Sequence, residues 1–286
     1  MGILIGLVPA LGWGLQALVM QKIGGKYTNK TLGMALTTIV FGIAAYFYLR
    51  PEMTAALLWG SILSGLSWSL GQILQTKSFD LLGVSTAMPV STGEQLVLTT
   101  LLGAIALQEW THAWQYFVGL PAIAIIVLGV AFTTVEDNKI EKGGSSNLKK
   151  GMLILIISSI GQAGYAVLPR VFDLNGGDVL LPQSIAMTAG VMLLSSFEKD
   201  NDMFGKKTWQ NMLTGICFSV ANVGLLFSNQ INGVAVGFTL SQLNVVVSTI
   251  GGIWFLHEVK TKHEMKYTMW GLALVVLGAV LIGITK

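Results

Sequence analysis

Amide and aromatic side chains recur at helical spacing inside apolar runs of this 286-residue chain that are long enough to cross a membrane. Within each run they fall three, four or seven residues apart, which places them on one face of a helix. Amides donate and accept hydrogen bonds without charge, and an aromatic ring can cover an apolar C–H face. The set therefore predicts a site for a sugar. The candidate residues are Trp13, Gln16, Trp68, Gln72, Gln75, Gln162, Tyr165, Asn222, Gln242 and Asn244.

The same side chains also suit a structural role, because polar groups in membrane helices bond neighbouring helices at about 0.6 kcal/mol each. For any single Ser or Thr we prefer that interpretation. For the clustered amides with tryptophan and tyrosine we favour the sugar site. A cation exporter would need carboxylates or an aromatic cage, and a phosphate carrier would need Lys or Arg within the runs. We find no lysine or arginine at the middle of any run.

Glu94 is the one ionisable residue near the middle of an apolar run, five residues after Pro89. A carboxylate at that depth is costly when ionised, so it is expected to hold a proton part of the time. This property suits a proton-coupling residue. Pro89 removes a backbone donor from the expected helix, so we expect the helix to be easily broken near Glu94 and consider Pro89 structural or gating. The alternative is a neutral carboxyl that bonds a helix carbonyl for stability. Asp80, by contrast, is predicted at the start of the helix that follows Lys77.

Two acids stand at predicted helix ends, in LQEWT (107–111) and LHEVK (256–260). Each precedes the next predicted helix, whose free N–H groups its carboxylate can accept. We therefore interpret Glu109 and Glu258 as structural or gating residues. His257 lacks a second histidine at the spacing of a zinc helix, and the single cysteine, Cys217, excludes an internal disulfide. No metal and no cofactor are expected.

The elements that carry these residues are predicted to be membrane helices. Hydrophobic residues make up 53% of the chain and charged residues only 11%, against about 25% in soluble domains. The net charge of +3 is too small to suggest nucleic acid as a partner, so membrane lipid is the expected surrounding. No phosphate loop, nucleophile triad or glycosidase-like carboxylate pair appears, and we do not expect an enzyme.

Ten runs are long enough to cross a bilayer, and they are continuously apolar, which favours helices over the alternating pattern of a barrel. A polar, Gly/Ser-containing linker at 136–150 divides the chain into five-helix halves at 1–135 and 151–286. The fold class predicted is an all-α integral membrane protein. The expected spans are 2–21, 31–49, 54–76, 82–107, 112–134, 151–169, 179–197, 208–229, 233–256 and 267–285.

The basic residues predict the orientation in the cell membrane. Fourteen of the 17 fall in connections that would lie on one side, and only Arg50, Arg170 and Lys286 fall on the other. Lys and Arg mark the cytoplasmic side, so both termini are expected outside and the linker in the cytoplasm. The fourteen are Lys22, Lys26, Lys30, Lys77, Lys139, Lys142, Lys149, Lys150, Lys199, Lys206, Lys207, Lys260, Lys262 and Lys266.

The two halves resemble each other at offsets of 149 and 150. Gln72 falls on Asn222 and Glu94 on Asn244, while Glu109 falls on Glu258. Because each half has an odd number of expected spans, the copies must lie in opposite orientations, and the charges of matched connections reverse accordingly. Inverted repeats are typical of secondary transporters, which hold substrate between the halves at mid-membrane.

The chain resembles the drug/metabolite transporter superfamily of ten-span proteins, and within it the bacterial glucose/ribose uptake family. The residues that carry this resemblance are VPALGWG (8–14), KGMLILIISSIGQAGYAVLP (150–169) and the paired helix-end acids Glu109 and Glu258. It covers essentially the whole chain. The resemblance implies a proton-coupled importer of glucose or ribose.

The leading hypothesis is thus a monosaccharide importer that alternates access around a mid-membrane site, with the proton as coupling ion. An exporter of amino acids, nucleosides or drug-like metabolites on the same fold is the alternative within transport. A membrane sensor or assembly subunit is a third, with little support because the linker is short. The identity of the sugar and the oligomeric state stay open.

Overall fold

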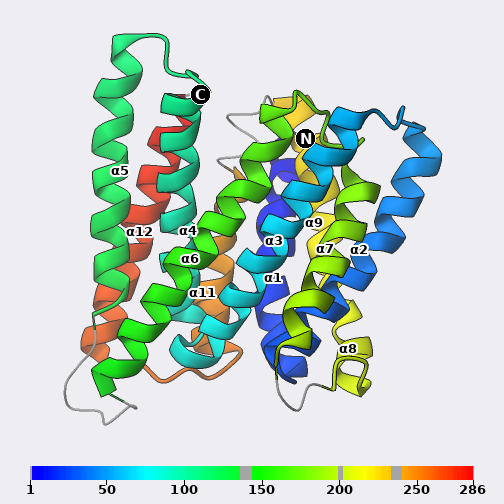
Figure 1. Ribbon diagram of the computed structural model, residues 1–286. Coiled ribbons are helices and arrows are strands. Elements are labelled where there is room, and N and C mark those ends of the chain that lie inside the picture. The colour runs from blue at the N-terminus through cyan, green and yellow to red at the C-terminus, as the bar shows by residue number, and fades with distance from the viewer. Residues whose placement is uncertain (1, 136–143, 199–201, 233–239, 286) are drawn as a thin grey trace.

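The computed structural model describes residues 2–135, 144–198, 202–232 and 240–285, and within these ranges every regular element is a helix (Figure 1). One of them, η1, is a π-helical turn that continues α4. The elements are α1 Gly2–Ile23, α2 Tyr27–Leu49, α3 Ala55–Leu82, α4 Val84–Leu101, η1 Leu102–Ala106, α5 Ala113–Thr133, α6 Gly144–Val171, α7 Leu180–Ser196, α8 Lys206–Gln210, α9 Met212–Asn232, α11 Asn244–Trp254 and α12 Lys262–Ile284.

Six of the described helices are long and apolar enough to cross a membrane. They contain or overlap six of the expected spans, and helices also occupy described parts of the other four. The protein is a multi-pass helical membrane protein, as the composition predicted. The six segments are Leu4–Ile23, Tyr27–Leu49, Ala55–Leu82, Ala113–Thr133, Leu148–Val171 and Lys262–Ile284.

Several boundaries differ from the expectation. Helix α3 continues to Leu82, so Asp80 lies in its last turn, and its placement at the start of the next helix was wrong. Gly83 is the single residue between the end of α3 and the start of α4. Its φ of +74° is a backbone conformation that residues with a side chain rarely adopt. Helix α6 begins at Gly144, inside the expected linker, of which residues 136–143 lie outside the described part of the chain.

The helices form one bundle in which segments distant in sequence lie side by side (Figure 1). Helix α3 packs against α6 and α7, α1 against α9 and α11, and α5 against α12. Both termini reach the same end of the bundle, and α8 lies at the other end.

Small residues allow the backbones of α1 and α9 to touch. The backbones of α6 and α3 touch in the same way. A Cβ atom at Gly12 would lie 2.8 Å from the carbonyl oxygen of Cys217, and one at Gly161 would lie 2.7 Å from that of Ser67. Real Cβ atoms do not approach so closely, so any larger residue would push these helices apart. Gly12 and Gly161 are 149 positions apart, and Ser67 and Cys217 are 150 apart.

A second pair of contacts follows the same correspondence. A Cβ atom at Gly65 of α3 would lie 2.5 Å from the carbonyl oxygen of Gln183, and one at Gly215 of α9 would lie 2.7 Å from that of Met34. The glycines are 150 positions apart and their partners 149. Residues matched by the sequence offset thus make matched contacts in space.

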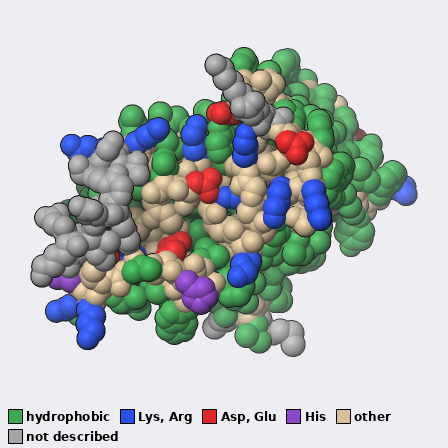
Figure 2. Space-filling view, turned by 90° about the horizontal axis from the view of Figure 1, so that it is seen from below, with side chains coloured by type: hydrophobic (Ala, Val, Ile, Leu, Met, Phe, Trp, Pro, Cys, Tyr) green, Lys and Arg blue, Asp and Glu red, His purple; other side chains and the backbone are tan. Residues whose placement is uncertain are grey.

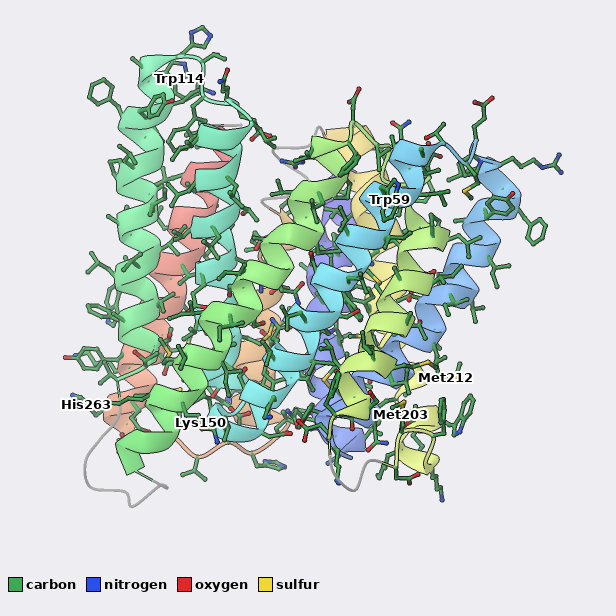
Figure 3. The ribbon with its side chains drawn as sticks, viewed as in Figure 1. Trp59, Trp114, Lys150, Met203, Met212 and His263 are labelled. Carbon is green, nitrogen blue, oxygen red and sulfur yellow. The ribbon has the colours of Figure 1, made fainter. Side chains whose placement is uncertain are left out.

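Lysines gather at one end of the bundle, which we call the lysine-rich end. Figure 2 looks onto this face and shows Lys and Arg side chains interleaved with acidic ones. Lys150 and His263 lie at this end, whereas Trp59 and Trp114 lie at the opposite end (Figure 3). Tryptophan is common at membrane–water boundaries.

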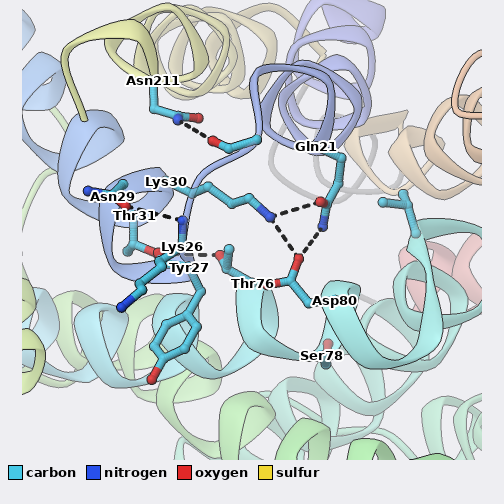
Figure 4. Close-up of polar contacts among 12 residues, drawn as sticks. Gln21, Lys26, Tyr27, Asn29, Lys30, Thr31, Thr76, Ser78, Asp80 and Asn211 are labelled. Carbon is cyan, nitrogen blue, oxygen red and sulfur yellow. Dashed lines mark hydrogen bonds and ion pairs between the residues drawn. The ribbon is translucent and has the colours of Figure 1, made fainter. Parts of the chain in front are cut away.

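Lys30 is not on a connection, as the span boundaries had implied, but is buried in the first turns of α2, with 2% of its surface exposed. Its Nζ donates to Asp80 Oδ1 at 2.7 Å and to Gln21 Oε1 at 2.8 Å (Figure 4). A buried ammonium needs such partners. The cluster joins α1, α2 and α3 at the lysine-rich end.

A second cluster at this end joins α2, α3 and the end of α7. Lys77 Nζ lies 3.6 Å from Glu198 Oε1 and 4.8 Å from the centre of the Tyr27 ring. A hydrogen bond from Tyr27, helped by the charge of Lys77, holds the pKa of the Glu198 carboxyl below its usual value. These side chains are exposed enough that water weakens the pair.

Candidate functional site

A cavity of about 140 Å³ lies among α1, α3, α4, α6, α9 and α11. It is smaller than the roughly 300 Å³ at which sites for drug-sized ligands begin, so its size suits a small ligand. No charged side chain is among its described lining residues. Eight of the ten predicted binding residues line it: Trp13, Gln16, Gln72, Gln75, Gln162, Tyr165, Gln242 and Asn244.

Several polar atoms of this wall have no hydrogen-bond partner in the described part of the chain. The Trp13 indole N–H and Asn244 Oδ1 are buried without one, and Gln16, only 6% exposed, makes no side-chain hydrogen bond there. Leaving a buried polar group unpaired costs about 1–3 kcal/mol. A ligand that offers both hydroxyl donors and hydroxyl acceptors matches the hydrogen-bonding chemistry of these groups.

Other amides of the wall are linked to each other. Gln162 of α6 donates from Nε2 to Oε1 of Gln72 of α3 at 3.2 Å, where the backbones of these helices meet. Gln72 also reaches Thr76 of its own helix at 3.4 Å. The link holds two amides in place at the seam between α3 and α6.

The structure does not place the other two predicted binding residues, Trp68 and Asn222, on the cavity. Trp68 is fully buried and packs behind the wall against Phe218, with ring centres 5.4 Å apart. Asn222 borders a separate space of about 20 Å³ near α2 and α7 and contacts the Tyr165 side chain. Trp68, Gln72 and Gln75 share one face of α3, which had suggested that Trp68 lines the cavity. Phe218 of α9 lines it instead.

Sequence reasoning missed the contribution of α4 to the wall. Four residues of α4 line the cavity at spacings of four, three and four: Met88, Thr92, Gln95 and Thr99. This spacing places them on one face of the helix, as for the predicted residues of the other helices. Gln95 directly follows Glu94, so the cavity face and the carboxyl face of α4 are adjacent. The remaining lining residues that were not predicted are Phe79, Leu96, Ala166 and Phe218, with Ala17.

Glu94 lies beside the cavity and is not among its lining residues. The Glu94 side chain is half-buried on α4. Its Oε2 atom accepts a hydrogen bond from the Ser159 hydroxyl of α6 at 2.9 Å. Helix α4 continues through the buried Pro89 without a break. The carboxyl thus faces the contact between α4 and α6, one helical position away from the wall.

Glu258 was expected to cap the helix that follows it, α12. It caps α4 instead. Its two carboxylate oxygens accept from the backbone N–H groups of Val84 at 2.6 Å and Ser85 at 2.8 Å. Helix α12 has a cap of its own, because the Thr261 hydroxyl and the Glu264 carboxylate pair reciprocally with its first turn. The Glu258 carboxylate is therefore available to another helix.

Glu109 occupies the same kind of turn at the opposite end of the bundle. Gln108 and His257, the residues before the two acids, share a left-handed backbone with φ of +53° and +55°. The Glu109 carboxylate, however, meets Arg170 Nη1 at 3.2 Å and caps no described helix start. Its expected role at the start of α5 was wrong, since Gln115 pairs with the His112 backbone there.

Comparison with known proteins adds the family. A sequence model of the family described as "Sugar transport protein" matches residues 4–285. A Listeria monocytogenes protein named for sugar uptake is 44% identical over the full length of both chains. The glucose uptake protein GlcU of Bacillus subtilis is 40% identical, over 100% of this chain and 99% of its own. A crystal structure with 17% identity superposes with a TM-score of 0.63, covering 98% of this chain and 95% of the other, which shows a shared fold.

The two acidic turns give a matched prediction about stability. Glu258→Ala should lower the free energy of unfolding by about 2–4 kcal/mol, because two charge-assisted hydrogen bonds to α4 are lost. Glu109→Ala should cost about 1 kcal/mol or less, because it removes a partly exposed ion pair. Denaturant unfolding of both purified variants in detergent measures the difference. Equal losses would contradict the capping role.

Proposed function

The chain belongs to the sugar transport protein family, and from that premise we propose that it imports a monosaccharide of the glucose or ribose class by proton-coupled alternating access. The observation that carries the proposal is the uncharged cavity, whose wall combines amides with an indole and a phenol. Its unpaired donors and acceptors match a ring of hydroxyl groups. The name of the Bacillus subtilis relative supports glucose and the direction of uptake.

Export of amino acids, nucleosides or drug-like metabolites is less well supported. A zwitterionic amino acid would leave its charges without a partner, because the described lining residues carry none. A cavity of about 140 Å³ is also small for a nucleoside or drug. Saturable uptake of labelled glucose or ribose into proteoliposomes tests the proposal, and its absence for every hexose and pentose would refute it.

For the architecture we propose ten spans in two inverted halves, 1–135 and 151–286, joined by the linker at 136–150. The matched glycine contacts of α1 with α9 and of α6 with α3 support it, as do the matching turns at Gln108 and His257. Two halves that repeat the same contacts in opposite directions can rock about a site between them.

The acidic turns supply candidate gates for such rocking. Glu258, from the second half, holds the start of α4 in the first half at the lysine-rich end. Glu109 makes no equivalent contact with a described helix start at the opposite end. We propose that the Glu258 contact closes the cytoplasmic side and breaks when the protein opens inward.

Gln16 gives the sharpest test of the sugar site. Gln16→Ala should raise KM for the transported sugar about fivefold to a hundredfold, because a buried hydroxyl loses its amide partner. Gln115→Ala is the matched control, since Gln115 is a similarly buried amide that bonds the backbone of Thr285 and His112, away from this cavity. Its KM should stay within about twofold of the native value. Uptake kinetics in proteoliposomes decide, and similar KM values for both variants would mean that Gln16 only joins helices.

Glu94 gives the test of coupling. Glu94→Gln mimics the protonated carboxyl and keeps an acceptor for Ser159, so it should still bind sugar and exchange it across the membrane. It should not accumulate sugar under an imposed proton gradient, because the cycle no longer moves a proton. Counterflow and gradient-driven uptake separate the two activities. Accumulation by the variant would exclude Glu94 as the coupling residue.

The proposed orientation places the lysine-rich end in the cytoplasm and both termini outside. In a Cys217→Ser background, a cysteine at Pro51 should react with a membrane-impermeant thiol reagent in intact cells. A cysteine at Lys150, at the lysine-rich end, should react only after permeabilisation. The reverse pattern would overturn the orientation and the assignment of Glu258 to the cytoplasmic side.

A further inference from the structure

Two glutamines from different helices converge on one serine hydroxyl behind the cavity wall. Gln75 of α3 and Gln95 of α4 each donate from Nε2 to Ser91 Oγ, both at 2.8 Å. Ser91 is completely buried, while both glutamines line the cavity. The serine thus lies one layer behind the wall and contacts the side chains that form it.

The hydroxyl of Ser91 meets the same group of both amides. Its oxygen has two lone pairs and can accept from two N–H groups, but it has one proton and can serve only one carbonyl. In the structure both glutamines point their NH₂ groups at Ser91 and so use both of its lone pairs. Neither Oε1 atom then accepts a hydrogen bond from any described residue.

We propose that Ser91 is a positioning residue that turns Gln75 and Gln95 into a pair of hydrogen-bond acceptors for two hydroxyl groups of the substrate. The inference rests on the proposed function and adds a basis for selectivity. A pair of carbonyl oxygens attracts hydroxyl donors and repels carboxylates, ethers and other acceptors. A sugar that lacks one of these hydroxyls leaves a carbonyl unpaired in the wall.

The second half of the chain carries a related arrangement. Ser241, which is 150 positions after Ser91, is also completely buried and accepts from Nε2 of the lining residue Gln242 at 3.2 Å. The two serines correspond at the offset of 150, whereas Gln242 follows its serine directly in sequence and corresponds to Thr92. A buried serine in contact with a cavity amide thus recurs in the second half.

The test compares sugar selectivity in proteoliposomes. KM is measured for D-glucose and D-ribose and for their singly deoxygenated analogues, in the native chain and in Ser91→Ala. In the native chain, two analogues of the transported sugar should show KM values about tenfold or more above the parent. In Ser91→Ala the ratio of analogue KM to parent KM should fall to about threefold or less for both analogues. The freed amides can then rotate and donate instead.

Two further variants separate selectivity from folding. Gln95→Leu should remove the discrimination for one of the two analogues and leave the other, since it deletes one acceptor. Ser69→Ala removes an equally buried serine that bonds only backbone carbonyls at the α3–α7 contact, and it should leave both ratios unchanged.

Each outcome decides between the claims. Sugar uptake with unchanged ratios in Ser91→Ala would overturn the role of Ser91 and leave the proposed function in place. The same loss of both ratios in Ser69→Ala would also overturn it, by showing a general structural effect. If the native chain takes up no monosaccharide, the proposed function fails and this inference fails with it.

Discussion

Helices surrounded by hydrocarbon gain little from burying apolar side chains against each other, since lipid tails are equally apolar, so close packing at small residues must hold this protein together. At Gly12 and Gly161 the neighbouring backbone lies where a side chain would begin. Such close approach fixes the relative positions of α1 with α9 and of α6 with α3. Gln72 and Gln162 lie directly beside the contact between α3 and α6.

The cavity follows from this packing. Its wall includes Gln72 of α3 and Gln162 of α6, which lie directly next to the point where these helices touch and bond to each other there. Polar side chains at that depth are costly unless they are paired. Some are paired with each other, whereas the Trp13 indole N–H has no partner in the described part of the chain.

The sequence predicted the helices and the polar stripes well, because both depend on local periodicity. Periodicity gives the face on which a residue lies, and so it brought Gln16, Gln75 and Gln162 to one cavity. It does not give the neighbour that the face meets. Trp68 was therefore expected on the wall, although Phe218 of a distant helix stands in front of it.

The errors at charged residues have the same origin. Lys30 was expected in a chain connection and Asp80 at the start of a helix, yet the two pair with each other and so tolerate places within α2 and α3. Glu258 was assigned to the next helix because that start was nearest in sequence. Once α12 capped itself, only the three-dimensional arrangement could show that the carboxylate reaches α4.

That long-range cap has a consequence for synthesis of the chain. Glu258 follows Val84 by 174 residues, and a ribosome adds roughly 5–20 residues per second. The amide groups at the start of α4 must wait roughly ten to thirty-five seconds for their carboxylate. During that interval they need water, so the start of α4 has to rest at the aqueous boundary, and the two halves complete each other only after Glu258 has been synthesised.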